Sequence, residues 1–320
     1  MHGSVYLARR LALAAGTVFV AITLNFILFR AAPGDAVSNL SRVPHASPEL
    51  KAQLRHEFGL DKSKWQQYLL YLKELLHGNL GISFADQQPV SHDLGVALGN
   101  TIPMVLLGTV IAILVGVLTG TLAAWRRGGV TDQVNTNLAI AFYSFPTQWL
   151  GLMLLILFAG VLPTSGMVNE FAFNQTWWAH VQDVLRHMVL PSATLALTLY
   201  GQYTLIARSA MLETLSEDYV LTARAKGLRN GTVVRRHAFR NALLPTTTMV
   251  ALSLGYVVGG AILIETVFSW PGIGRAVYQA VLQRDYPMLQ GAFLVLTLSV
   301  VLFNLLADLL YFKLDPRVTE

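Results

Sequence analysis

The sequence predicts an all-α protein that crosses a membrane several times. Hydrophobic residues make up 54% of its 320 positions, and charged residues make up only 13%. Soluble globular chains carry roughly 25% charged residues, and the mean hydropathy of +0.51 also indicates that a bilayer surrounds much of the chain. The third observation is a series of apolar runs, each near the roughly 20 residues that a membrane-spanning helix needs.

Six apolar runs are predicted as spans, and the fourth is the weakest of them. They are Leu11–Phe29, Ile102–Trp125, Leu138–Leu162, Met188–Ala207, Thr246–Phe268 and Met288–Phe312. Polar residues interrupt the fourth run, among them Thr194, Thr198, Gln202 and Thr204. We expect these side chains to face other helices or a water-filled path.

A signal peptide is the alternative interpretation of the first run, because Arg9 and Arg10 precede it and small residues follow it. The apolar region of a signal peptide is about 7–15 residues long. This run is longer, so we predict a retained first helix over residues 1–31.

The distribution of basic residues predicts how the spans are oriented. Six spans place both termini on one side, and the segments 1–10, 126–133, 207–245 and 313–320 hold 13 of the 23 Lys and Arg residues. Because basic residues accumulate in short cytosolic loops, we expect both termini in the cytosol.

The predicted orientation divides the chain into four parts. Residues 32–100 become an extracytosolic insert, with a helix capped by Ser47 and an amphipathic helix over Trp65–Leu76. Residues 101–312 form the transmembrane domain, and residues 313–320 form a cytosolic tail.

The segment between the fourth and fifth spans, residues 213–245 (the 213–245 loop), carries signals of order. Ser216 can cap a helix with Glu217 and Asp218 in its first turn, where the helix dipole favours acidic residues. Tyr219–Lys226 favours a helix, and Gly227 can end that helix with a positive φ.

The remainder of the 213–245 loop predicts a second helix, Val233–Leu244, before Pro245 leads into the membrane. The small side chains of Ala223 and Ala225 would let a partner approach the first helix closely. A short helix on a stiff support suits insertion into a groove of a partner. The alternative interpretation is a solvated basic loop.

The 213–245 loop closely resembles the coupling segment, or EAA loop, of ATP-binding-cassette (ABC) importer permeases. Residues 217–228, Glu-Asp-Tyr-Val-Leu-Thr-Ala-Arg-Ala-Lys-Gly-Leu, look like the form found in dipeptide, oligopeptide and nickel permeases. So do residues 237–245, His-Ala-Phe-Arg-Asn-Ala-Leu-Leu-Pro. Leu221 and Thr222 occupy slots that the broader family fills with Glu and Ala, which leaves docking intact but puts a role for that Glu in doubt.

The resemblance covers nearly the whole chain, which is identified as the first (B-type) permease subunit of such an importer. Further matching motifs are Arg30–Asp35, Phe58–Lys62, Gly78–Ser83, Glu265–Arg275, Arg284–Pro287, Asp308–Tyr311 and Asp315–Arg317. The resemblance implies the type I ABC importer fold in the plasma membrane of a prokaryote. It also implies a second permease subunit, two ABC ATPase subunits, an extracytosolic substrate-binding protein and a peptide substrate.

No cofactor is expected in this chain. It lacks a glycine-rich phosphate loop of the Gly-x4-Gly-Lys-Ser/Thr type. ATP and magnesium would therefore be bound by the partner ATPases, and the chain would be a transport subunit without catalytic residues.

Three sets of candidate site residues follow from this interpretation. The residues expected to contact the ATPase are Ser216, Glu217, Asp218, Tyr219, Ala223, Arg224, Ala225, Lys226, Gly227 and Leu228. An outer gate, or a contact with the binding protein, is expected from Phe268, Trp270, Pro271, Gly272, Gly274 and Arg275, with anchoring at the membrane surface as the alternative. The pathway would be lined by Gln148, Thr198, Gln202 and Tyr203.

Several polar residues receive structural interpretations. We expect Glu265 to contact the partner permease or water at the headgroup level, Asp308 to bond to a neighbouring helix, and Asn25 to donate an interhelical hydrogen bond. Histidine is a common nickel ligand, so a nickel site is one hypothesis. No two histidines lie at i and i+4 on a predicted helix; the positions include 45, 56, 77, 92, 180, 187 and 237. No metal site is predicted.

The leading function is ATP-driven import of di- or oligopeptides, and nickel import is the alternative within the family. An ion-coupled secondary transporter would require an intramembrane carboxylate or a pair of broken helices, and the sequence offers no convincing one. A membrane enzyme is disfavoured because no catalytic cluster is visible. The net charge of +5 does not indicate nucleic-acid binding, because the basic residues lie between apolar runs.

Overall fold

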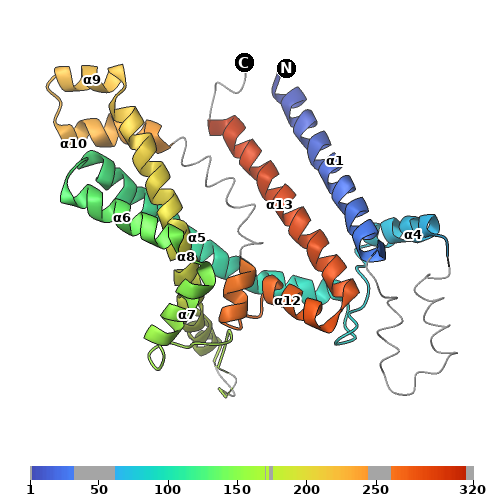
Figure 1. Ribbon diagram of the computed structural model, residues 1–320. Coiled ribbons are helices and arrows are strands. Elements are labelled where there is room, and N and C mark those ends of the chain that lie inside the picture. Colours follow the sequence, from blue (N-terminus) through green and yellow to red (C-terminus); the bar gives the residue numbers. More distant parts are fainter. Residues whose placement is uncertain (1, 32–61, 170, 173–175, 244–260, 315–320) are drawn as a thin grey trace. The chain divides into compact units, whose positions relative to one another are not determined.

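The computed structural model describes residues 2–31, 62–169, 171–172, 176–243 and 261–314, and the elements in these residues are helices (Figure 1). They are α1 (His2–Ala31), α4 (Lys64–Leu76), α5 (Val90–Trp125), α6 (Val130–Ser144), α7 (Thr147–Leu157), α8 (Trp177–Leu215), α9 (Asp218–Ala225), α10 (Asn230–Thr232), the π-helix η1 (Val233–Ala238), α12 (Ile273–Gln283) and α13 (Tyr286–Leu314). Within the described residues, extended pairing is limited to one isolated bridge between Ile82 and Pro89. The expected all-α architecture is therefore confirmed.

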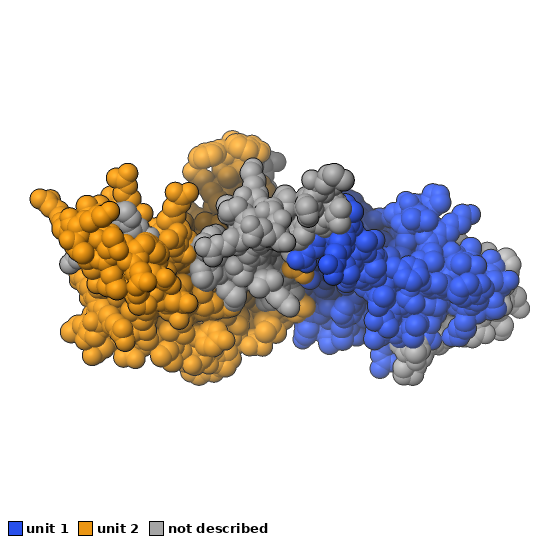
Figure 2. Space-filling view, turned by 90° about the horizontal axis from the view of Figure 1, so that it is seen from above, with its two compact units in different colours: residues 1–100, 272–301 blue, residues 101–271, 302–320 orange. Residues whose placement is uncertain are grey.

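The chain divides into two compact units, which Figure 2 colours separately. Unit 1 comprises Met1–Asn100 and Gly272–Val301, and unit 2 comprises Thr101–Pro271 and Leu302–Glu320. Each unit is built from segments that are distant in the sequence.

Three described helices are long and apolar enough to cross a membrane: Ala8–Arg30, Val90–Trp125 and Tyr286–Leu306. They overlap the first, second and sixth predicted spans, although the second helix begins at Val90, 12 residues before the predicted Ile102. The fifth predicted span, Thr246–Phe268, lies mostly outside the described residues, and its last part is helical over 261–267. The expected helix beginning at Ser47 also lies outside them.

The third predicted span, Leu138–Leu162, is not one straight helix. α6 and α7 together are apolar enough to cross a membrane, but the chain bends by 105° between them. The break falls at Phe145 and Pro146, where both residues have extended ψ values. Proline lacks a backbone N–H and disfavours the helical conformation of the residue before it, so it ends α6. Hydropathy detected the apolar run but not this interruption.

The fourth predicted span lies inside α8, a helix of 39 residues with Pro191 in its interior. The polar side chains of Thr194 and Thr204 are fully buried. Thr194 donates to the Leu190 carbonyl at 2.9 Å, and the Thr204 hydroxyl lies 3.2 Å from that of Thr119 on α5. The expectation that such residues face other helices is confirmed for Thr204, whereas the Thr194 hydroxyl bonds within its own helix.

Glycines on α5 allow the backbones of α5 and α8 to approach closely. A methyl group on Gly116 would lie 2.7 Å from the Cβ of Tyr203, and one on Gly108 would lie 2.8 Å from the Ser192 carbonyl. Gly120 faces the backbone of α8 in the same way. Helix pairs in membranes associate through such small residues, since lipid provides little hydrophobic driving force.

In unit 1, α1 packs against α4 and α13 through aromatic and polar contacts. The Asn25 amide donates to the Gln290 carbonyl at 2.9 Å, which confirms the expected interhelical hydrogen bond. The buried Phe26 ring contacts Tyr68 and Tyr71 of α4. α4 itself confirms the predicted helix Trp65–Leu76, and a capping box formed by Ser63 and Gln66 begins it.

Replacing Gly116 with alanine should destabilise the protein by about 2 kcal/mol, because the new methyl group would overlap Tyr203. Gly99→Ala on the same helix is the matched control, since nothing lies within 4 Å of a methyl group there. Thermal unfolding of the detergent-purified variants measures the difference. Equal midpoints for the two variants would contradict this account of helix packing.

Candidate functional site

The 213–245 loop begins directly at the end of α8, and its described part runs to residue 243. Ser216 is the C-cap of α8, and its hydroxyl donates to the Glu213 carbonyl at 2.6 Å. Glu217 takes the N-cap position of α9, without a side-chain capping bond. The prediction that Ser216 caps the loop helix is therefore wrong: its hydroxyl satisfies a carbonyl orphaned at the end of α8.

α9 ends as the sequence predicts. Gly227 has a φ of +75°, a conformation that favours glycine. Its N–H donates to the Arg224 carbonyl at 2.9 Å, and the N–H of Leu228 reaches back to the Ala223 carbonyl at 3.4 Å. These two bonds form a Schellman motif, which closes the helix and reverses the chain.

The returning half of the 213–245 loop is helical from residue 230 to 243, but it is not a regular α-helix. It starts at Asn230, before the predicted Val233, and passes through a π-helical turn over Val233–Ala238. Such turns are frequent at functional sites. Leu244 and Pro245 lie outside the described residues.

A small apolar core holds α9 against its neighbours. Val220 and Ala223 are buried with Val233, Ala238 and other side chains of the returning half, together with residues of α5 and α8. The Asn241 amide also donates to the Tyr219 hydroxyl at 2.8 Å. Ala223 therefore packs inside the chain, and the prediction that it lets a partner approach is wrong; Ala225 is exposed.

α9 and the turn that follows it also expose apolar side chains. Tyr219, Leu221 and Leu228 are 40–50% exposed. Of the expected contact residues, those that are exposed are Ser216, Glu217, Asp218, Tyr219, Arg224, Ala225, Lys226, Gly227 and Leu228. α9 thus presents an apolar centre, with acidic residues at its start and basic residues at its end. Figure 1 shows it at the end of α8.

The predicted outer-gate residues separate into buried and exposed groups. Phe268 and Trp270 are fully buried in the core cluster of unit 2, beside Met188 and Leu190. Trp270 therefore packs within the protein, and the alternative interpretation of this loop as a surface anchor is wrong for that side chain. Among the other predicted residues, Pro271 is exposed and Arg275 is half-buried.

The buried position of Trp270 follows from the turn that precedes it. Ser269 has a φ of 51°, its N–H donates to the Thr266 carbonyl at 3.3 Å, and the Trp270 N–H donates to the Glu265 carbonyl at 2.9 Å. This second Schellman motif folds Trp270 back toward the core. Gly272 then forms the N-cap of α12, in which Gly274 is buried.

Glu265 makes a contact within the chain that the sequence did not reveal. Its carboxylate is fully buried and accepts a hydrogen bond from the Thr101 hydroxyl at 2.6 Å. The expectation that Glu265 reaches a partner permease or headgroup-level water is therefore wrong. A buried charge needs such hydrogen bonds, since leaving it unsatisfied is costly.

The predicted pathway residues lie in different environments. Gln148 is exposed at the start of α7, whereas Thr198 and Gln202 are half-buried one helical turn apart on α8. The Thr198 hydroxyl donates to the Thr194 carbonyl at 2.9 Å. Tyr203 is fully buried in contact with Ala112 and Ala196, so its ring packs between helices. A lining role stays a prediction for the other three.

Two buried carboxylates accept hydrogen bonds from side chains that are distant in the sequence, and these contacts were not predicted from the sequence. Asp132 on α6 accepts two hydrogen bonds from Arg208 on α8, at 2.7 and 3.0 Å. Asp285 accepts a 2.6 Å hydrogen bond from the Ser83 hydroxyl and a 3.1 Å bond from the Met288 N–H. The partners of the two side-chain bonds are 76 and 202 residues apart, so no local pattern could have indicated them.

The loop that holds Ser83 also contains a carboxylate with a shifted pKa. Burial would raise the pKa of the Asp86 carboxyl, but hydrogen bonds, including one from the Gln88 N–H at 3.1 Å, outweigh it, so the pKa lies below its usual value. Asp86 therefore stays ionised at neutral pH.

The described residues contain no group of three or more potential metal ligands. His187 is buried, and its Nδ1 lies 2.9 Å from the Asp183 carbonyl and 3.3 Å from the Asp183 carboxylate. His45 and His56 lie outside the described residues, as does the side chain of His237. Asp308 lies on α13, but its side chain also falls outside what the structure describes.

Comparison with known proteins places these features in a family. Residues 116–320 match the model for the inner membrane component of binding-protein-dependent transport systems, and residues 4–105 match the model for the N-terminal part of such membrane components. The chain belongs to this family of ABC importer permeases. It is a transport component rather than an enzyme.

The curated relatives align along their whole length. The chain is 39% identical to the dipeptide transport system permease protein DppB of Escherichia coli, with 98% of each chain covered. It is 38% identical to the di/tripeptide transport system permease protein DppB of Pseudomonas aeruginosa and 35% identical to the dipeptide permease of Alkalihalophilus pseudofirmus, again with 98% coverage of both chains.

Replacing Thr101 with valine should cost about 2 kcal/mol, because it removes a hydrogen bond to a buried charge. Thr109→Val on the same helix is the matched control. The Thr109 hydroxyl is buried, and it has no hydrogen-bond partner within the described part of the chain, so its loss should be neutral or stabilising. Thermal unfolding distinguishes the two, and equal effects would contradict the assigned role of Thr101.

Proposed function

We propose that this permease imports di- or oligopeptides across the plasma membrane of a prokaryote, with energy from ATP hydrolysed by partner subunits. The observation that carries the proposal is α9, a short helix fixed on its own apolar core and exposing an apolar face, in a chain whose relatives are named as dipeptide permeases. A second permease subunit, two ATPases and an external binding protein complete the assembly.

In the proposed mechanism, the exposed side of α9 occupies a groove of the ATPase. Leu221 and Leu228 fill the apolar part, while Arg224 and Lys226 contact acidic groups at the rim. The core beneath α9 joins it to α5 and α8, so movement of the ATPase is transmitted to the transmembrane helices. A two-state movement biased by nucleotide would alternate access between the two sides.

The orientation supports this assignment. With both termini in the cytosol, the 213–245 loop faces the compartment that holds ATP, and the basic residues of the loop agree with that side. The same orientation would place residues 32–100 outside the cytosol.

The two alternatives receive less support. A nickel importer of the same family has no observation in its favour over a peptide importer. A secondary transporter would use a broken helix at the substrate site, and α6 and α7 do form a bent pair. However, Pro146 explains that bend, and the family match along the whole chain favours an ATP-driven importer.

Gly227→Val should uncouple ATP hydrolysis from transport. A β-branched residue in the left-handed region costs about 1–2 kcal/mol, so the Schellman end of α9 should loosen while the complex still assembles. Uptake of labelled dipeptide by reconstituted vesicles should fall at least about fivefold, a change equivalent to about 1 kcal/mol, with ATPase activity retained.

Gly231→Val provides the control, because Gly231 is exposed, nothing lies within 4 Å of a methyl group there, and its φ is not in the left-handed region. This variant should transport like the wild type. Full coupling in the Gly227 variant would refute the role given to the turn.

Leu221→Glu tests the docking face directly. Placing a charge at the centre of an apolar contact should weaken binding by several kcal/mol, so the ATPases should no longer co-purify with the permease. Thr232→Glu makes a similar charge change at an exposed position on the returning half of the loop. Retention of both ATPases by the Leu221 variant would show that the partner binds elsewhere.

A further inference from the structure

α4 lies beside the end of a membrane-spanning helix. Arg30 ends the apolar stretch Ala8–Arg30, whose 23 residues span about 35 Å and so reach the headgroup region. The Lys64 ammonium donates to the Arg30 carbonyl at 3.4 Å, and the Tyr68 hydroxyl bonds to Thr23 at 2.7 Å. These contacts place α4 against the last two turns of this apolar stretch, near its end.

α4 has two different long faces. Gln67, Tyr68 and Tyr71 form the face that is wholly or partly buried, and both tyrosines contact Phe26 of α1. Large apolar side chains elsewhere on the helix are open: Trp65 is 66% exposed and Leu76 is 87% exposed. Tryptophan at such a position is typical of the headgroup level.

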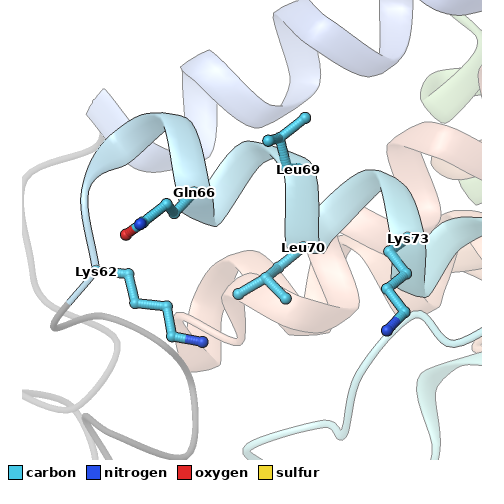
Figure 3. A pocket seen from close by; sticks show the side chains of 5 residues that line it. All are labelled: Lys62, Gln66, Leu69, Leu70 and Lys73. Atoms are coloured by element: carbon cyan, nitrogen blue, oxygen red, sulfur yellow. The ribbon is translucent and has the colours of Figure 1, made fainter.

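A shallow pocket runs along the open side of α4 (Figure 3). It is lined by Lys62, just before the helix, and by Gln66, Leu69, Leu70 and Lys73, which have the spacing of one helix face. In Figure 3 the side chains of Lys62, Leu70 and Lys73 extend to the same side of the helix. The pocket is therefore an apolar floor with a cation near each end.

The charges around the pocket are unbalanced. Neither the Lys62 nor the Lys73 ammonium forms an ion pair within the described residues. The acid of α4, Glu74, instead accepts a hydrogen bond from Asn79 at 2.8 Å. The two lysines are 11 residues apart in the sequence, with Lys62 just before the helix and Lys73 within it, and their flexible side chains can narrow the distance between the two ammonium groups. The pocket thus suits an extended anionic group with apolar chains attached.

We propose that this pocket binds the headgroup of an anionic phospholipid. Lys62 and Lys73 contact the phosphate-bearing headgroup, Gln66 donates to its oxygens, and Leu69 and Leu70 contact the glycerol backbone and the first acyl carbons. With the orientation proposed above, the lipid belongs to the outer leaflet of the plasma membrane.

A lipid fits these observations better than a soluble anion. A site for free phosphate would need enclosed donors, whereas this pocket is open and its centre is apolar. Its position at the membrane boundary, beside exposed Trp65, brings acyl chains within reach. Basic side chains near a membrane surface each attract anionic lipid by a few-fold in affinity.

The test uses the complete permease complex in detergent, with phosphatidylglycerol and phosphatidylethanolamine supplied in equal amounts. Native mass spectrometry counts the lipids retained during a titration. Each single variant, Lys62→Gln or Lys73→Gln, should weaken binding of one phosphatidylglycerol by about fivefold, and the double variant by about 30-fold. Binding of phosphatidylethanolamine should not change.

Lys64→Gln is the matched control, because it removes the same charge from the same helix but Lys64 bonds to Arg30 outside the pocket. It should change binding by no more than about twofold. If all three single variants weaken binding equally, diffuse attraction accounts for the result and the pocket is refuted. Wild-type binding by the double variant would also refute it.

A second variant keeps the test decisive if the double variant does not fold. Leu69→Glu adds a negative charge in the pocket at an exposed position and should repel phosphatidylglycerol alone.

Displacement of the lipid by millimolar inorganic phosphate would indicate a free-phosphate site instead. Loss of binding-protein affinity with unchanged lipid retention would indicate a protein-docking surface, and either outcome would overturn the proposal.

Discussion

The close approach of α5 and α8 is the constraint on which unit 2 depends. Gly108, Gly116 and Gly120 leave no room for a side chain between the two helices, so hydroxyls and backbone carbonyls of α8 come within contact distance of α5. In a bilayer this contact is valuable, because lipid tails compete with apolar side chains but not with close backbone packing. α8 then carries the docking helix α9 at its end.

The 213–245 loop combines rigidity with an unfilled surface. Val220 and Ala223 supply one half of a core that is completed by the returning half of the loop and by α5 and α8. Leu221 of the same helix and Leu228, in the turn that follows it, stay open. The π-helical turn contributes Val233 and Ala238 to this core. Because α9 is already held by its own chain, we expect it to transmit movement without first becoming ordered.

Three buried carboxylates form hydrogen bonds between segments that are distant in the sequence. Glu265 bonds to Thr101, Asp132 to Arg208 and Asp285 to Ser83. Each carboxylate is buried and accepts a hydrogen bond from its partner, so each contact holds two distant segments of the chain together.

The sequence by itself determined the helical class, the positions of three long apolar helices, the helix at Trp65–Leu76 and the end of α9 at Gly227, because periodicity, composition and a left-handed glycine act locally. The bend at Pro146 and the C-cap role of Ser216 are also local, but hydropathy and composition did not reveal them. The tertiary structure alone decided the burial of Ala223, Tyr203 and Trp270. Residues of these types occur at either kind of position, and the neighbours that decide between them come from distant parts of the chain.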